Sequence, residues 1–362
     1  MTYRLPKNCL LTVSKDLLPW FEANARELPW RLNRDPYAVW VSECMLQQTR
    51  VETVIPYFLR WMACFPTVKA LAAADQQQVL KCWEGLGYYA RARNLHAASK
   101  QVVALFGGEL PSQVDELSRL KGVGPYTVAA ILSLAFGKSY AVLDGNVERV
   151  LTRLCAISDD IRKPQVKKDL QNLATRFLAT HPPAQLNEAV MELGATVCTP
   201  RNPQCDCCPL ASICRAHKRG EVSLFPYKSK KPKIPTVQVG AGVVWRDEHT
   251  FLIAQRNESG MLGGMWEFPG GKIEKNESIE ACIARELEEE LGLKVEVGDE
   301  LIKVKHTYTH FHLRMGVHHC RWQGDEPEAI DCADFRWVTL AECEAYPFSR
   351  ADLKVLEALA SQ

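Results

Sequence analysis

The stretch Leu120-Lys121-Gly122-Val123-Gly124-Pro125-Tyr126-Thr127 decides the fold of the first half of this chain. Its two glycines allow positive φ angles, and their backbone N–H groups lie at the start of the next helix, where the helix dipole favours an anion. The stretch therefore predicts a tight hairpin between two helices, with a phosphate as its natural ligand. An ordinary loop between packed helices remains an equally good interpretation of these residues alone.

A single carboxylate follows this hairpin. The helix predicted over 128–136 is nearly all apolar, and Leu143-Asp144-Gly145-Asn146-Val147 comes after it, so Asp144 is the one charge in this region. The residue is well placed to cap the next helix, and a carboxylate isolated among apolar residues is also a candidate for catalysis. The hairpin and Asp144 do not decide between these roles.

Length, composition and charge limit the class of protein. At 362 residues the chain can form two domains with substantial cores, and its composition is that of a soluble globular protein. It has no apolar run of membrane-spanning length and no secretory signal at its start, so we expect a cytoplasmic protein. The net charge of +1 hides two unlike parts: 31 − 20 = +11 for residues 1–235 and 13 − 23 = −10 for residues 236–362. The basic part is typical of a nucleic-acid binder, and the acidic part of a metal site or a solvated acidic surface.

Residues 1–197 show helical periodicity throughout, which predicts an all-α domain. Near its start, Glu43 is the one ionisable carboxyl in the apolar run 37–46. Burial would raise its pKa towards the value that a general acid needs, although a buried ion pair with an arginine is an equally good explanation. Gln47-Gln48-Thr49 and the run 85–89, which includes Leu86 and Tyr88, place amide and aromatic side chains at segment ends, where they could enter a base stack.

Four of the fourteen cysteines form one cluster, Cys198, Cys205, Cys208 and Cys214, spaced C-x6-C-x2-C-x5-C. Four thiolates at this spacing can enclose one metal centre, and the spacing leaves both a tetrahedral zinc and an iron–sulfur cluster open. Cys207 is a fifth cysteine that neither arrangement needs.

A second domain follows a basic, proline-containing linker over 218–235. From Thr236 the periodicity changes to two, which indicates strands in an α+β domain over 236–362. Within it, Gly271-x5-Glu277-x7-Arg285-Glu286-Leu287-x-Glu289-Glu290-x-Gly292-Leu293 predicts a strand, a loop and an acidic helix. Glu286, Glu289 and Glu290 fall on one helical face, where they would repel each other unless a magnesium or manganese ion lies among them. A solvated acidic helix is the alternative.

These motifs together resemble known families over almost the whole chain. The hairpin followed by Leu143-Asp144-Gly145-Asn146-Val147 is similar to the helix-hairpin-helix and Gly-Pro-Asp signature of the endonuclease III superfamily of DNA glycosylases, whose iron–sulfur loop has the same cysteine spacing. Ser42-Glu43-x-Met45-Leu46-Gln47-Gln48-Thr49 resembles the MutY family, which removes adenine mispaired with 8-oxoguanine. The resemblance implies a 4Fe-4S cluster at the four cysteines, and it implies duplex DNA with A:8-oxoguanine or A:G mispairs as the substrate.

The resemblance also implies roles for individual residues. In this family mechanism, Glu43 protonates the flipped adenine at N7, and Asp144 stabilises the sugar cation or forms a transient adduct with it. Asn146 orients Asp144 or the water, and Tyr126 stands where the lyase branch has its lysine, so no Schiff base is expected. The remaining implied contacts are Trp30, Arg31 and Glu188 to adenine, Gly122 and Gly124 to a phosphate, Gln48 and Tyr88 as intercalating residues, and Thr49 and Leu86 near the lesion base.

The second domain resembles the Nudix fold. In MutY proteins this domain reads 8-oxoguanine through a Phe-Ser-His loop, which corresponds here to Tyr308-Thr309-His310. Its catalytic box has usually decayed in that family but is complete here, and Trp266-Glu267-Phe268-Pro269-Gly270-Gly271-Lys272 resembles the MutT-type 8-oxo-dGTP hydrolases. Arg350 stands where those hydrolases have a purine-reading asparagine. A bifunctional enzyme that also hydrolyses oxidised nucleoside triphosphates with Mg²⁺ is therefore an alternative.

The sequence thus predicts a monomeric multidomain repair enzyme. Residues 1–217 form the all-α glycosylase domain with its iron–sulfur loop over 198–214, residues 218–235 the linker, and residues 236–362 the Nudix-like domain. A DNA-binding module without catalysis is the alternative from another class, and Glu43 and Asp144 argue against it because binding alone requires neither carboxyl.

Overall fold

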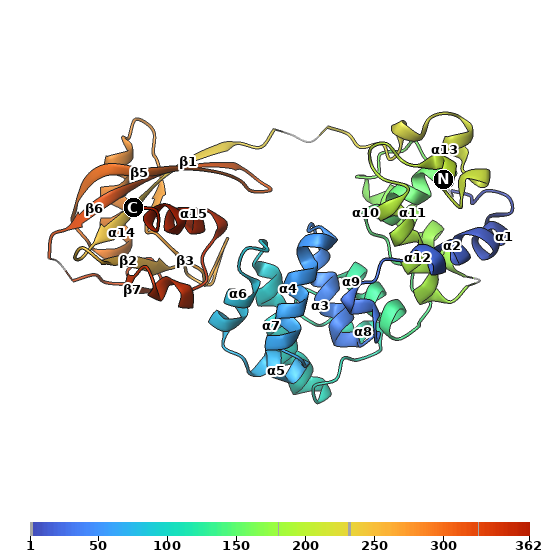
Figure 1. Ribbon diagram of the computed structural model, residues 1–362, viewed down its shortest axis with the longest axis horizontal. Helices are drawn as coiled ribbons and strands as arrows, with labels where there is room; N and C mark the ends of the chain where they lie inside the picture. Colours follow the sequence, from blue (N-terminus) through green and yellow to red (C-terminus); the bar gives the residue numbers. More distant parts are fainter. Residues whose placement is uncertain (1–2, 180, 231–232, 325) are drawn as a thin grey trace. The chain divides into compact units, whose positions relative to one another are not determined.

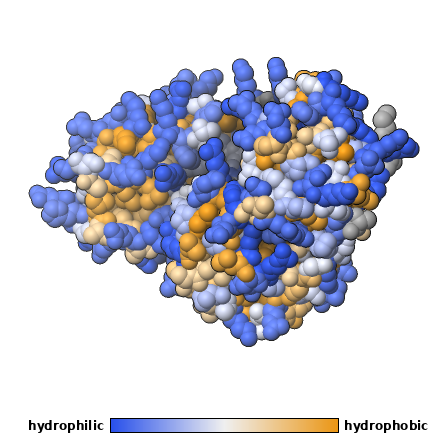
Figure 2. All heavy atoms as spheres, turned by 45° about the vertical axis from the view of Figure 1, so that its right-hand side comes forward, coloured by the Kyte–Doolittle hydropathy of each residue, from blue (hydrophilic) through white to orange (hydrophobic). Residues whose placement is uncertain are grey.

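The computed structural model describes residues 3–179, 181–230, 233–324 and 326–362. The chain forms two compact units, Met1–Ala72 with Ala97–Lys231, and Ala73–His96 with Pro232–Gln362. Figure 1 traces the helices of the first part and the sheet of the second, and Figure 2 shows hydrophilic residues over most of one face with apolar patches between them. Positions 231 and 232 of the predicted linker lie outside the described residues.

Helices build the first unit, as the periodicity predicted. The elements that belong to it or enter it are α1 (Cys9–Thr12), η1 (Val13–Leu17), α2 (Leu18–Asn24), η2 (Pro29–Arg31), α3 (Pro36–Leu46), α4 (Val51–Cys64), α5 (Val68–Ala73), α7 (Ala90–Phe106), α8 (Val114–Leu117), α9 (Pro125–Ala130), η3 (Ile131–Ala135), α10 (Gly145–Cys155), α11 (Pro164–Leu178), α12 (Pro183–Thr196), η4 (Cys205–Cys207), η5 (Ala211–Ile213), α13 (Arg215–Lys218) and η6 (Val222–Leu224). In the described part of the chain, none of the helices combines the length and hydropathy needed to cross a lipid bilayer.

The predicted hairpin lies between α8 and α9, but its two glycines have different roles. Gly122 has a φ of 75°, which confirms the prediction of a left-handed turn residue. Gly124 has an extended backbone with φ −88° and ψ 174° and is the N-cap of α9, so the prediction of a positive φ is wrong there. A Cβ at Gly124 would meet no atom within 4 Å, so the position is open above the helix start.

Two elements, α12 and η3, hold the segment that leads to Asp144. Asn187 on α12 is buried, and its side-chain amide donates to Ser133 Oγ (3.0 Å) and to the Tyr140 carbonyl (2.8 Å). Its oxygen accepts from the Val142 backbone N–H (3.1 Å). One amide therefore ties α12 and η3 to the extended residues just before the catalytic candidate.

The second unit contains an α+β domain whose sheet has the strand order β3-β2-β1-β6-β5, with β4 paired to β1 and β7 paired to β2. Its elements are β1 (Thr236–Trp245), β2 (Thr250–Gln255), β3 (Trp266–Glu267), β4 (Gly270–Lys272), α14 (Ile279–Leu291), β5 (Val295–Thr307), β6 (His312–Trp322), β7 (Asp334–Thr339), η7 (Glu342–Ala345) and α15 (Arg350–Leu359). The strands predicted around Phe251, Val304, Met315 and Phe335 are β2, β5, β6 and β7. Residues 73–96, with α6 (Gln76–Trp83), complete the unit.

The two helices of this domain cover opposite faces of its sheet. Ala241 and Val243 belong to the apolar cluster that includes α15, whereas Val244 belongs to the cluster that includes Ile283 and Leu287 of α14. This division follows the alternation of side chains along β1. The sheet therefore lies between α14 and α15, with a hydrophobic core on each side.

We predict that Asn187→Ala lowers the free energy of unfolding by about 2–4 kcal/mol, because it leaves buried donors and acceptors at Ser133, Tyr140 and Val142 without their partner. Asn172→Ala, at an exposed position on α11, is the control and should change stability by less than about 0.5 kcal/mol. Urea denaturation of both variants checks this. Equal effects at the two positions would show that the Asn187 hydrogen bonds do not support the fold.

Candidate active site

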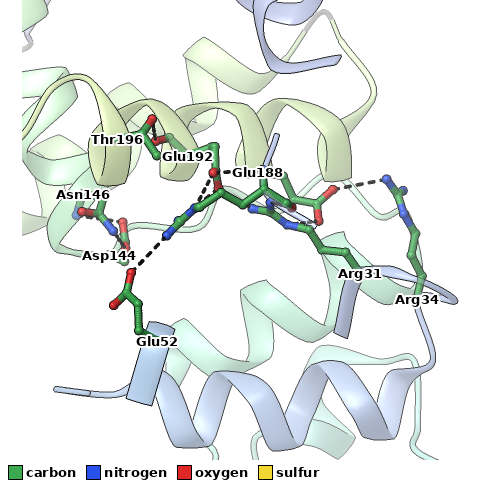
Figure 3. A network of polar contacts seen from close by, with 9 residues as sticks. Arg31, Arg34, Glu52, Asp144, Asn146, Glu188, Glu192 and Thr196 are labelled. Carbon is green, nitrogen blue, oxygen red and sulfur yellow. Dashed lines mark hydrogen bonds and ion pairs between the residues drawn. The ribbon is translucent and has the colours of Figure 1, made fainter. Parts of the chain in front are cut away.

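A cavity of about 910 Å³ in the first unit contains most of the predicted site residues. Of these, Trp30, Arg31, Glu43, Gln48, Thr49, Tyr126, Asp144, Asn146 and Glu188 line it. They come from separate helices and their connections, and Figure 3 shows the Asp144–Asn146 pair near a second group of polar contacts that includes Arg31 and Glu188. A cavity of this size can admit a single nucleotide.

Glu43 is a buried carboxyl on α3 with 3% of its surface exposed. Burial raises its pKa to about 7, although the hydrogen bond from the Tyr126 hydroxyl (2.5 Å) acts in the opposite direction and the Asp144 charge raises it further. Arg31 exerts only a minor opposing influence on this pKa, and no ion pair joins it to Glu43 among the described residues. The group is therefore available in its protonated form near neutral pH, as a general acid requires.

Asp144 is both the N-cap of α10 and a member of the cavity wall. Its Oδ1 accepts from the backbone N–H groups of Asn146 (3.0 Å) and Val147 (2.7 Å), and its Oδ2 accepts from Asn146 Nδ2 (2.8 Å). Burial raises the pKa of Asp144, and these donors offset part of that rise because they favour the ionised form. The structure thus confirms the predicted N-cap, and the same contacts fix the carboxylate in one orientation.

Arg149 and Gly194 support this pair, and sequence reasoning missed both. The buried Arg149 guanidinium donates from Nη2 to Asn146 Oδ1 (2.7 Å) and to the Gly194 carbonyl (2.6 Å), and from Nε to the Cys198 carbonyl (2.7 Å). A Cβ at Gly194 would lie 2.6 Å from the Asn146 Cβ, so only glycine lets α12 approach Asn146 this closely. The i, i+3 spacing of Asn146 and Arg149 on one helix was the available signal.

An arginine–glutamate network forms the opposite part of the cavity wall (Figure 3). The fully buried side chain of Glu192 binds Arg26 Nε (2.6 Å) and Arg31 Nη2 (2.9 Å). Glu188, one turn earlier on α12, pairs with Arg31 Nε (3.3 Å) and Arg34 Nη2 (3.2 Å). Arg31 therefore bridges two carboxylates, which fixes its guanidinium at the cavity. Glu192 and Arg26 were not predicted, although Glu188 and Glu192 share one face of an otherwise apolar helix.

Other predicted residues lie outside this cavity. Gly122 and Gly124 lie in the hairpin, while Leu86 and Tyr88 belong to the second unit. In that unit the Tyr88 hydroxyl lies 2.8 Å from Thr309 Oγ1, so one intercalation candidate meets one lesion-reading candidate. Tyr308 packs against His306 and Phe311, whereas Thr309 and His310 are exposed.

The four cysteines of the cluster line one small cavity with Arg153, while Cys207 is exposed and does not line it. The thiols form no disulfide, and Arg153 Nη1 lies 3.3 Å from Cys198 Sγ. Among the described residues, no three Cys, His, Asp or Glu side chains are close enough to ligate one metal ion as they stand.

The acidic helix of the second unit has an arginine among its carboxylates, which relieves part of the repulsion that the sequence predicted. Arg285 pairs with Glu277 (2.8 Å), Glu286 (2.9 Å) and Glu289 (3.0 Å). It therefore neutralises two of the three predicted metal ligands. Gly271 lets Glu286 approach the strand, since a Cβ there would lie 2.1 Å from the Glu286 carboxyl carbon.

Glu290 also interacts with two other acids, the half-buried Glu267 and the buried Asp352, and the sequence did not reveal this group. Burial, followed by the Glu286 charge, raises the pKa of Glu290 to about 7. Burial also raises the pKa of Glu267 to about 8, although Arg256 binds it at 2.5 Å, and raises that of Asp352 to about 6. In the sequence, Glu267 stands out only as part of a motif. Asp352 has no distinguishing pattern there, because its burial depends on the packing of α15.

The family is settled by comparison with known proteins. The model of the HhH-GPD superfamily of base excision DNA repair proteins matches residues 41–176, and that of the NUDIX domain matches residues 240–358. The human protein named adenine DNA glycosylase is 36% identical over 96% of this chain and 73% of its own length. This chain belongs to the adenine DNA glycosylase family. A relative from Buchnera aphidicola subsp. Acyrthosiphon pisum, which is also named adenine DNA glycosylase, is 32% identical over 83% of this chain and 84% of its own length.

A solved structure agrees with this placement of the first unit. A thermostable thymine-DNA glycosylase is 27% identical, with a TM-score of 0.54, and is matched over 59% of this chain and 98% of its own. The predicted multidomain fold, a helical glycosylase part followed by a Nudix-type α+β part, is therefore confirmed. This adenine DNA glycosylase family member is a DNA N-glycosylase.

We predict that the Glu43→Gln variant gains stability over the wild type as the pH is raised from 5 to 8. The folded state holds a proton on Glu43 up to about pH 7, whereas the unfolded chain releases it near 4.5, so the carboxyl costs stability as pH rises through this window. The difference approaches about 3 kcal/mol above pH 7. Thermal unfolding of both proteins at several pH values measures it. A wild-type-minus-variant difference that does not change with pH would contradict the burial of Glu43.

Proposed function

We propose that this enzyme hydrolyses the N-glycosidic bond of adenine mispaired with 8-oxoguanine or guanine in duplex DNA. The observation that carries the proposal is the pair of buried carboxyls in one cavity: Glu43 has a pKa near 7, and Asp144 is held by donors that favour its ionised form. Two carboxyls in different environments can act as acid and as cation stabiliser at the same pH.

The reaction follows from these two groups. With the nucleotide turned out of the duplex, protonated Glu43 gives its proton to N7 of adenine, and the bond between N9 and the sugar carbon breaks with its electrons going to the base. Asp144 stabilises the positive charge that develops on the sugar, either by its field or by a transient bond to the sugar carbon. Water then adds to that carbon, and its proton returns to a carboxylate. Tyr126 keeps Glu43 oriented and lines the pocket.

The base itself would contact the arginine–glutamate network. Trp30 is buried beside Phe58, at 5.3 Å between ring centroids, and offers an apolar wall for a purine. Arg31 and Glu188 supply a donor and an acceptor at the same cavity, and Glu192 holds Arg31 in place. Adenine presents both acceptor nitrogens and an amino donor, so this pairing supports adenine as the excised base.

Duplex binding uses the remaining predicted residues. In this proposal the hairpin at Gly122 and Gly124 binds a backbone phosphate, Gln48 and Tyr88 enter the base stack, and Thr49 and Leu86 contact the lesion base. Tyr308, Thr309 and His310 read 8-oxoguanine. The exposure of Thr309 and His310 and the 44% exposure of Tyr88 support these roles. The boundaries 1–217, 218–235 and 236–362, the monomeric state and the cytoplasmic location remain predictions.

We also propose a 4Fe-4S cluster bound by Cys198, Cys205, Cys208 and Cys214. These residues fit it because all four thiols line one cavity and Arg153 places a positive charge beside Cys198 Sγ. The choice of this cluster over zinc rests on the cysteine spacing, which resembles the iron–sulfur loop of the endonuclease III superfamily. The cluster, when bound, would brace the loop to which Arg149 and Arg153 are hydrogen-bonded.

The cluster proposal predicts iron and inorganic sulfide in the purified protein and absorption in the visible range. Cys198→Ser should lose iron, whereas Cys207→Ser should keep it because Cys207 is exposed and does not line the shared cavity. Elemental analysis and the visible spectrum measure this. Stoichiometric zinc without iron would overturn the assignment.

For the glycosylase, we predict adenine release from a duplex that carries adenine opposite 8-oxoguanine. Glu43→Gln and Asp144→Asn should each slow release by at least about 10³-fold, since each removes one of the two charge-handling groups. Glu52→Gln is the matched control: Glu52 lines the same cavity, but its side chain is 77% exposed. Single-turnover kinetics separate the variants. Normal release by the Glu43 and Asp144 variants would disprove their assignment.

A second candidate function is hydrolysis of oxidised nucleoside triphosphates by the Nudix-type domain with Mg²⁺. The observation that favours it is the raised pKa of Glu290 beside Glu286, because two carboxyls that repel each other form a site which a divalent cation would stabilise. Glu286, Glu289 and Glu290 are the proposed ligands, and Arg285 already orients two of them. Arg350 at the start of α15 leaves the identity of the base open.

This second function predicts magnesium-dependent pyrophosphate release from 8-oxo-dGTP by the wild type. Glu290→Gln should reduce the rate by at least about 10²-fold, because it removes one cation ligand. Glu288→Gln, at an exposed position on the same helix, should not. Colorimetric detection of pyrophosphate measures the rates. No release by the wild type would leave the domain as a reader of DNA.

A further inference from the structure

One segment of the domain formed by residues 236–362 is basic, although the domain as a whole is acidic. Residues 301–322 contain Lys303, Lys305, Arg314 and Arg321 together with five histidines, and they contain no Asp or Glu. The rest of residues 236–362 carries 13 − 4 = 9 basic against 23 acidic residues, or −14. A basic segment within an acidic domain marks the surface on which an anion is expected.

The strand register concentrates these charges on one face. Lys305 on β5 stands directly opposite Arg314 on β6, and Thr307 stands opposite His312. Lys305 and Arg314 are exposed, whereas their chain neighbours Val304 and Leu313 are buried in the core on the α15 side, so the two cations project together from the opposite face of the strand pair. On the far side of β6, Thr236 of β1 pairs with His312 and extends the same row.

Two cations directly opposite each other destabilise a strand pair unless an anion lies between them. In the described parts of the chain, neither Lys305 nor Arg314 forms an ion pair, whereas the nearby Lys303 binds Glu300 at 3.0 Å. From the α15 side of the sheet, Lys354 Nζ donates to the Lys305 carbonyl (3.0 Å), so a third cation lies near this strand pair. The fold thus gathers positive charge here without neutralising it.

These residues surround a groove of about 360 Å³. It is lined by Thr236, Lys305, His306, Thr307, His312, Leu313 and Arg314. Beside the two cations, the groove contains the hydroxyls of Thr236 and Thr307 and the imidazole of His312, whose Nδ1 lies 3.0 Å from Thr307 Oγ1. Cations flanked by hydroxyl donors form the chemical environment that a phosphate prefers.

We propose that this groove binds a backbone phosphate of the DNA strand read by the loop 308–310. The groove residues Thr307 and His312 flank that loop on both sides, so a DNA strand contacted by Thr309 and His310 would run next to the groove. This inference rests on the proposed function, since it takes the loop to contact DNA. The phosphate contact fixes the register of the lesion strand, while the loop reads the base.

The test is duplex binding by the double variant Lys305→Ala/Arg314→Ala. All proteins carry Asp144→Asn so that the adenine:8-oxoguanine duplex stays intact, and the matched control is Lys275→Ala/Lys294→Ala, which removes two exposed lysines elsewhere on the domain. We expect the double variant to raise the Kd about tenfold or more and to reduce the slope of log K against log salt concentration by about 1 to 2. The control should keep both values.

The outcomes separate this inference from the proposed function. If the parent protein binds the duplex and wild type releases adenine, but the double variant keeps its Kd and salt slope, the groove inference is wrong and the glycosylase stands. If wild type releases no adenine, the proposed function fails whatever the variant does. If the double variant binds duplex normally but loses affinity for 8-oxo-dGTP, the groove serves a free nucleotide and the inference is overturned. Thermal unfolding of each variant verifies that it is folded.

Discussion

The removal of one carboxyl from water is the constraint on which the active site depends. Glu43 lies on a helix whose residues from Tyr37 to Met45 are all buried, so its position follows from the packing of that helix, and no ion pair within the described part of the chain compensates its charge. The cost of burying a charge raises its pKa to about 7, and the hydrogen bond from Tyr126 limits that rise. Because the ionised form of Glu43 destabilises the fold, this carboxyl keeps its proton near neutral pH and can donate it to a base.

Burial also raises the pKa of the second carboxyl, Asp144, but several hydrogen-bond donors offset part of that rise. Asp144 is surrounded by donors from its own helix start and from Asn146, and Arg149 holds Asn146 while also binding the Gly194 and Cys198 carbonyls. The helix α10 therefore connects the cavity to the cysteine loop through one guanidinium. The close approach at Gly194 is part of this arrangement, since a side chain there would displace Asn146.

The two units handle acidic clusters differently. In the first unit, Glu188 and Glu192 are matched by Arg26, Arg31 and Arg34, so the network is close to neutral and rigid. In the second, Arg285 satisfies Glu277, Glu286 and Glu289, while Glu290, Glu267 and Asp352 share mainly Arg256 and hold their protons more tightly. Ion pairs with arginines balance the carboxylates of the first cluster. In the second cluster the carboxyls outnumber the arginines, so its charge would favour a bound cation.

The sequence by itself determined the two-part architecture, the hairpin, the helix cap at Asp144 and the two candidate carboxyls, because these depend on local patterns: glycine positions, a change of periodicity from 3.6 to 2, and isolated charges in apolar runs. Only the tertiary structure decided which residues support them. Glu192, Arg26, Arg149, Gly194 and Asp352 are ordinary in sequence, and their roles arise from contacts between elements distant in the chain. The register that places Lys305 opposite Arg314 also depends on the tertiary structure, because strand pairing is a property of the sheet and not of either strand.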